Sequence, residues 1–142
     1  MESQHPCLEE TLPHRSPVLL LTSCAKVRGE IMEAEAYIDE TCLFLRDNRT
    51  LEHSALIEIM AQCFASGCGL HKAIGFGYLA QVKKFVILKE VFLHDRLRVQ
   101  VQPVLDFENI VLVRGEIFRA EEKIAGGEFK VFHPKDARLS VR

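Results

Sequence analysis

One glutamate lies in the middle of a stretch that is otherwise almost entirely apolar. Residues 53–70 read HSALIEIMAQCFASGCGL, and as a helix they place apolar side chains on nearly every side. Such a helix must be buried, and this one is too interrupted and too polar to span a membrane. A buried carboxylate costs several kcal/mol unless it is paired or used in chemistry. Glu58 is therefore the first candidate for an acid–base group. The alternative is a structural acid that caps or bridges backbone groups of a neighbouring strand, or that lies at a wet edge of the helix.

The polar residues of this helix recur every fourth position, at Ser54, Glu58 and Gln62. Residues with this spacing lie on the same side of a helix, so they form one narrow polar file. Ser54 and Gln62, on either side of Glu58, are candidate substrate-binding residues.

Composition predicts one ordinary globular domain over residues 1–142. Hydrophobic residues make up 48% of the chain and charged residues 27%, and the net charge is −2. No run of Lys or Arg is present, so neither nucleic acid nor a membrane is an expected partner. The first residues lack the pattern of a signal peptide, and we expect a cytoplasmic protein.

No cofactor or metal is expected, because no phosphate-binding loop and no metal-ligand spacing occurs in the sequence. The five cysteines are odd in number and scattered, which predicts free thiols. A nucleophilic Cys42 beside His53 is an alternative, although no neighbouring cation in the sequence would activate it. The cysteines are Cys7, Cys24, Cys42, Cys63 and Cys68.

Before the helix, residues 18–27 form a short apolar run, and residues 30–38 alternate between apolar and acidic, which predicts a hairpin. Residues 39–50 have no periodicity and are long for a connection, which predicts a functional loop. We expect the central helix at residues 51–74, with Thr50 as its N-cap and Glu52 in its first turn.

After the helix the chain is predicted to be all strand. The strands are expected at residues 78–88, 96–105, 110–120 and 123–132, with a bulge at Gly126-Gly127. Tails are expected at residues 1–11 and 133–142. A curved antiparallel sheet wrapped around the long helix, in the α+β class, buries the apolar surfaces of both elements.

This order of elements resembles the hotdog fold, and three motifs resemble the 3-hydroxyacyl-acyl-carrier-protein dehydratases. The motifs are LPHRSPVLLL at residues 12–21, IEIMAQ at residues 57–62, and GYLA followed by VKKF at residues 77–85. The resemblance implies a thioester substrate carried by acyl carrier protein or coenzyme A. It also implies a dimer in which Glu58 works with a loop histidine of the partner subunit. Two groups are needed because the reaction has two proton transfers.

The chain departs from that family in its loop, which carries no histidine. Residues 46–49, Arg-Asp-Asn-Arg, instead resemble an Arg-Asp-Gly-Arg-like segment of the divergent dehydratase-like proteins of aryl-polyene clusters. Arg46 and Arg49 are candidates for binding a phosphopantetheine phosphate or an acidic carrier helix, and Asp47 for a proton shuttle. A solvated charged loop is the alternative.

Two histidines are candidates to replace the missing one. His53 lies in the first turn of the helix, about 140° around the axis from Glu58, so the two can meet only across a subunit interface or by a bent approach. A hydrogen bond at the helix start is the alternative role for His53. His14 fits the first motif, where it either acts in catalysis or positions the N-terminal segment.

Three functions remain open from the sequence. The leading hypothesis is a 3-hydroxyacyl-thioester dehydratase with Glu58 as acid/base and the acyl chain along the helix. The second is a hotdog thioesterase, in which the helix carboxylate activates water. The third is a catalytically inactive acyl-binding subunit that pairs with an active homologue. In each case we expect a homodimer or a higher oligomer, because the sheet has edges to cover.

Overall fold

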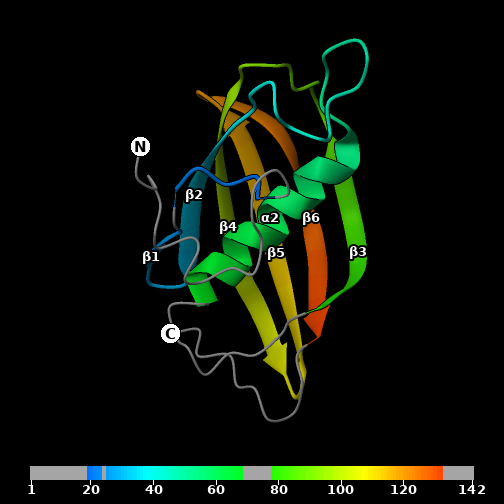
Figure 1. The fold of residues 1–142 in the computed structure, drawn as a ribbon. Helices are drawn as coiled ribbons and strands as arrows, with labels where there is room; N and C mark the ends of the chain where they lie inside the picture. Colours follow the sequence, from blue (N-terminus) through cyan, green and yellow to red (C-terminus); the bar gives the residue numbers. More distant parts are fainter. Residues whose placement is uncertain (1–18, 24, 69–77, 133–142) are drawn as a thin grey trace.

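A computed structural model describes residues 19–23, 25–68 and 78–132. Within these ranges one six-stranded sheet lies behind one helix, α2 (Figure 1). The strands are paired antiparallel in the order β1-β2-β4-β5-β6-β3. The elements are β1 (Lys26–Arg28), β2 (Ile31–Tyr37), α2 (His53–Cys68), β3 (Tyr78–Ile87), β4 (Arg96–Phe107), β5 (Ile110–Arg119) and β6 (Glu122–Phe132). The predicted fold class is confirmed.

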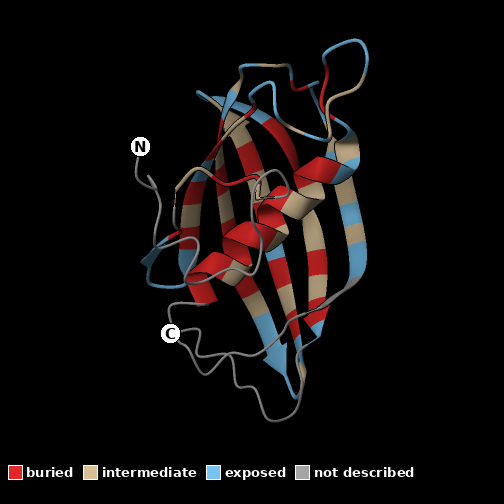
Figure 2. Ribbon diagram, in the orientation of Figure 1, coloured by how far each residue is buried: buried red, intermediate tan, exposed pale blue. Residues whose placement is uncertain are grey.

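Strand alternation sorts the side chains between the two faces of the sheet. On β4, Leu97, Val99 and Val101 are buried against α2, while the residues between them are partly exposed on the outer face. Figure 2 shows buried positions concentrated on α2 and on the strand positions behind it. Each large apolar side chain buried in this way contributes about 1.5–3 kcal/mol. One layer of side chains between helix and sheet therefore forms the core.

The first predicted strand is much shorter than expected. Among the described residues of this region only Lys26–Arg28 form a strand, and before it Leu21 makes a single bridge to Ala36. The backbone N–H groups of Leu20 and Ala25 instead donate to side chains of α2. We call residues 19–23 and 25 the strap, because they cross from the helix to the edge of the sheet. A short apolar run predicts a strand, but not which partner receives its hydrogen bonds.

The predicted bulge lies on the neighbouring strand. Lys84 and Phe85 of β3 together oppose Gly127 of β6, and Lys84 has a positive φ of 52°. A Cβ on Gly127 would lie 2.7 Å from the Cα of Phe85, so the bulge requires a glycine opposite it. The irregularity on β6 itself comes at Ile124, between the residues paired with Phe118 and Ile117.

The start of α2 also differs from the prediction. The helix begins at His53, and the carbonyl of Glu52 accepts the N–H of Ala55. The hydroxyl of Thr50 donates to Oδ1 of Asn48, 2.6 Å away, so Thr50 closes a loop turn and does not cap the helix. No acidic residue lies in the first turn of α2. Residues 69–74, which were expected to continue the helix, and both predicted tails lie outside the described residues. No helix among the described residues is long and apolar enough to cross a membrane.

Candidate functional site

Glu58 lies half-buried at the second turn of α2 and is the only acidic residue in that helix. Its Oε2 accepts a hydrogen bond of 3.0 Å from Nε2 of Gln62, one turn later. Gln62 is fully buried, and its Oε1 accepts the N–H of Leu20 at 2.9 Å. The carboxylate is therefore held on the side of α2 that faces the strap.

The polar file is longer than the sequence suggested. Ser66, four residues after Gln62, is also fully buried, and its hydroxyl accepts the N–H of Ala25 at 3.0 Å. Ser54, at the other end, is exposed. Two of the four polar side chains, Gln62 and Ser66, thus bind the strap. The recurrence of polar residues at every fourth position could have identified Ser66 from the sequence. The parts of Ser54 and Gln62 in substrate binding stay predictions, and the contacts of Gln62 indicate that it also positions Glu58.

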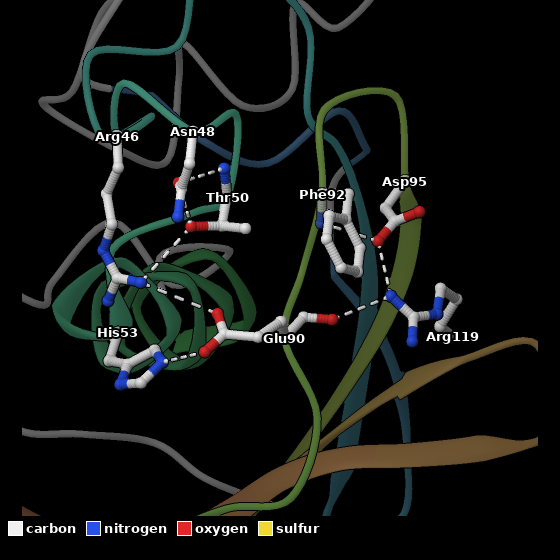
Figure 3. A network of polar contacts seen from close by, with 8 residues as sticks. All are labelled: Arg46, Asn48, Thr50, His53, Glu90, Phe92, Asp95 and Arg119. Atoms are coloured by element: carbon white, nitrogen blue, oxygen red, sulfur yellow. Dashed lines mark hydrogen bonds and ion pairs between the residues drawn. The ribbon is translucent and has the colours of Figure 1, made fainter.

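His53 points in a different direction from Glu58. Its Nε2 lies 3.3 Å from Oε2 of Glu90, a residue between β3 and β4 (Figure 3). Nη1 of Arg46 lies 3.6 Å from the other carboxylate oxygen of Glu90. No described contact joins His53 to Glu58, as the angle between them on the helix predicts. His14 lies outside the described residues.

The loop between β2 and α2 closes on itself at residues 46–50. The N–H of Arg46 donates to the carbonyl of Thr50 at 2.7 Å, and Asn48 accepts from both the N–H and the hydroxyl of Thr50. Arg49 adopts a positive φ of 71° and is exposed, as is Asp47. The side chain of Arg46 contacts Thr50 and Glu90, so of the two candidate arginines Arg46 is the one that shares a partner with His53.

Arg119 of β5 supports the segment that carries Glu90. Its Nη1 donates to the backbone carbonyl of Glu90 at 3.0 Å and to Oδ2 of Asp95 at 2.6 Å, and the same carboxylate oxygen accepts the N–H of Phe92 (Figure 3). Burial lowers the pKa of Arg119, but hydrogen bonds to Asp95 and Glu122 outweigh this and raise it. Sequence reasoning missed Glu90, Asp95 and Arg119, and no motif marks them.

The described cysteines are unsuited to nucleophilic chemistry. Burial raises the pKa of the Cys68 thiol to about 12, and it also raises the pKa of Cys63 and Cys42. A thiol in such surroundings is inert at neutral pH. The structure therefore argues against the alternative of a nucleophilic Cys42.

Two further features of the described residues bear on ligands. No group of three or more His, Cys, Asp or Glu side chains among them could hold a metal ion. A groove of about 370 Å³ lies on the outer face of the sheet, between β3, β6 and β5, and none of the predicted site residues line it. Its ion pairs, Lys123 with Glu116 and Arg114 with Glu128, are those of a solvated sheet surface.

Comparison with known proteins identifies a family that this chain matches. A model of ApeP-like proteins, described as ApeP dehydratase, matches residues 6–141. A search of curated proteins found no match. The match confirms the resemblance to the divergent dehydratase-like proteins of aryl-polyene clusters.

Solved structures show the same fold at low sequence identity. The chain is similar to a structure of the dehydratase heterocomplex ApeI:P from Xenorhabdus doucetiae, with a TM-score of 0.79 and 20% identity over 89% of this chain and 90% of that one. It is also similar to smu.793 from Streptococcus mutans bound to acetyl CoA, with a TM-score of 0.68 and 13% identity over 89% and 97% of the two chains. A third match is a hypothetical thioesterase from Streptococcus pneumoniae with coenzyme A, with a TM-score of 0.64 and 16% identity over 80% and 85%. The hotdog fold is therefore confirmed.

Proposed function

Because the chain belongs to the family of ApeP-like dehydratases, we propose that it takes part in removing water from 3-hydroxyacyl thioesters, with Glu58 as a proton-transfer group. The observation that carries this proposal is the placement of Glu58. It is the one acid on a helix that is otherwise packed into the core, and a fully buried Gln62 fixes its orientation. A carboxylate held in this way is pre-organised for proton transfer.

The reaction needs a second group, and His53 is the candidate among the described residues. Dehydration removes a proton from the α-carbon and delivers a proton to the departing hydroxyl. Glu58 and His53 are held in different directions, one towards the strap and one towards Glu90. We therefore propose that each site is shared, with Glu58 from one hotdog subunit and a histidine from another.

The second subunit is either another copy of this chain or a related hotdog protein. The edge strand β3 pairs only with β6 in the described sheet, so its other side is available for a partner strand. One similar structure bears the name of a heterocomplex, which supports a related partner. In either arrangement the thioester would lie between the subunits, where the exposed Arg49 could bind the phosphate of its pantetheine arm.

A catalytically inactive partner subunit is the second candidate function. The observation that favours it is the closed turn at residues 46–50, which occupies the loop before α2 without offering a histidine. In this reading the chain binds the acyl group along α2 and completes the site of an active homologue.

Product analysis distinguishes these functions. The purified chain is incubated with a 3-hydroxyacyl thioester, alone and together with a hotdog homologue that carries a loop histidine, and the enoyl thioester and free thiol are quantified. We expect enoyl product from the chain alone. Free thiol would instead indicate a thioesterase. Enoyl product that appears only in the mixture, above the homologue's own rate, would indicate a site shared with the homologue. In that case Glu58→Gln in this chain removes the excess product if Glu58 transfers protons, and leaves it unchanged if the chain is an inactive subunit. No product and no enhancement would contradict the proposal.

A further inference from the structure

Glu90 binds both His53, at the start of α2, and Arg46, in the loop before it. One carboxylate oxygen lies 3.3 Å from Nε2 of His53, and the other lies 3.6 Å from Nη1 of Arg46. We infer that Glu90 is a positioning residue that holds the imidazole of His53 in one orientation and one tautomer. This inference rests on the proposed function, because it gives His53 a defined part in that reaction.

The tautomer follows from the chemistry of the contact. An ionised carboxylate can only accept hydrogen bonds, so Nε2 of His53 must carry the proton that points to Glu90. In the neutral ring, Nδ1 then has no proton and is the nitrogen that can accept one. Figure 3 shows this second nitrogen on the side of the ring away from Glu90.

Two segments that are distant in the sequence fix the position of Glu90. Arg119 of β5 binds its backbone carbonyl at 3.0 Å, and Arg46 of the loop binds its side chain. Asp95 anchors Arg119 at 2.6 Å and closes the turn at Phe92. Because the backbone of Glu90 is tied to the sheet, its carboxylate presents a fixed acceptor to the helix start (Figure 3).

Stability alone gives a poor account of this arrangement. The side chains of His53 and Glu90 are 42% and 45% exposed, and an ion pair at such a site contributes about 0–1 kcal/mol. A carboxylate on the far nitrogen of a histidine is instead the usual way to orient an imidazole that acts as a base.

The role of the pair in the proposed reaction can be written step by step. Nδ1 of His53 takes a proton from the α-carbon, and the C–H electron pair passes into the thioester enolate. The enolate forms the α,β double bond and expels the hydroxyl, which leaves as water with a proton from the protonated Glu58 of the other subunit. Glu90 stabilises the imidazolium without taking its proton, and the imidazolium later returns its proton to Glu58 through water. The net products are the enoyl thioester and water.

The test uses the full chain labelled with ¹⁵N, with Glu90→Gln as the variant and Glu116→Gln as the matched control. Glu116 lies on the outer face of the sheet, pairs with Lys123 at 2.9 Å and has a similar exposure of 41%. The ring nitrogen signals of His53 are assigned by their loss in His53→Asn. We expect the wild-type ring to be protonated on Nε2 when neutral, and Glu90→Gln to populate both tautomers. We also expect Glu90→Gln to lower kcat about ten- to a hundredfold with KM little changed.

Several outcomes would overturn the inference: a wild-type ring protonated on Nδ1, a tautomer that Glu90→Gln leaves unchanged, or a kcat no lower than that of Glu116→Gln. Unfolding is monitored in parallel, and the wild-type spectrum decides the tautomer even if the variant is unstable. If the wild-type chain and its mixtures with a homologue show no turnover, the proposed function fails, while the spectra still decide whether Glu90 positions His53.

Discussion

Replacing Gln62 with methionine should remove a hydrogen bond that holds the strap to α2 and should lower the free energy of unfolding. The amide of Gln62 is fully buried and joins two partners, the N–H of Leu20 at 2.9 Å and the carboxylate of Glu58 at 3.0 Å. Methionine has a similar length and volume but can make neither hydrogen bond. The substitution therefore tests the polar contacts with little change in packing.

The expected cost can be worked out from these two contacts. Leu20 is only 5% exposed, so its unpaired N–H would cost about 1–3 kcal/mol. The bond to Glu58 is worth less, about 1 kcal/mol, because the half-buried carboxylate can partly regain water. A total of about 2–4 kcal/mol corresponds to a decrease in Tm of about 6–12 °C for a domain of this size.

Thermal and urea unfolding followed by circular dichroism measure this loss. The control is Gln102→Met, the same chemical change at a half-buried position on the outer face of the sheet, which should cost less than about 0.5 kcal/mol. A Gln62→Met variant that loses less than about 1 kcal/mol, or no more than the control, would refute the account of how the helix holds the strap.

Further predictions follow from the buried thiols, the bulge and the sheet edge. Iodoacetamide at pH 8 should leave Cys63 and Cys68 unmodified in the folded protein, as measured by peptide mapping. Modification of both thiols as fast as in urea would contradict this. Because burial raises the pKa of Cys68 from 9.0 to about 12, the unfolded chain releases this proton first, and the free energy of unfolding should fall as the pH rises from 9.0 towards 12. Gly127→Ala should lower the free energy of unfolding, measured in urea, by about 1–3 kcal/mol, because the new Cβ would lie 2.7 Å from the Cα of Phe85. A variant as stable as the wild type would show that the bulge can move. Light scattering at micromolar concentration should show a dimer or a larger oligomer, since β3 is an uncovered edge, whereas a monomer would remove the site shared between copies of this chain.

The sequence predicted those parts of the fold that depend on periodicity. Alternation in residues 30–38 predicted a strand with one apolar side, and Met32, Ala34 and Ala36 of β2 are buried in the structure. The apolar helix with Glu58 near its centre was likewise predicted, because a helix that is apolar all round can only be buried. Local patterns of this kind record which face of an element is covered.

The sequence could not predict contacts whose partners are distant. The run at residues 18–27 looked like a strand because its apolar residues favour one, but Gln62 and Ser66, about forty positions away, take the hydrogen bonds of Leu20 and Ala25. In the sequence Glu90 looks like any exposed glutamate. Only the fold, in which β3 ends beside the start of α2, brings it to His53. The catalytic parts of Glu58, His53 and His14, and substrate binding by Arg46 and Arg49, remain predictions.

The turnover of Glu58→Gln on a 3-hydroxyacyl thioester tests the central claim most directly. Glutamine keeps the size of the side chain and an oxygen that can accept from Gln62, while it removes the group that transfers protons. With Glu52→Gln, an exposed acid just before the helix, as the control, we expect kcat to fall about a hundred- to ten-thousandfold in Glu58→Gln alone, with Tm unchanged. A Glu58→Gln variant that unfolds several degrees lower with an unchanged kcat would show that Glu58 is a structural acid and would contradict its role in proton transfer.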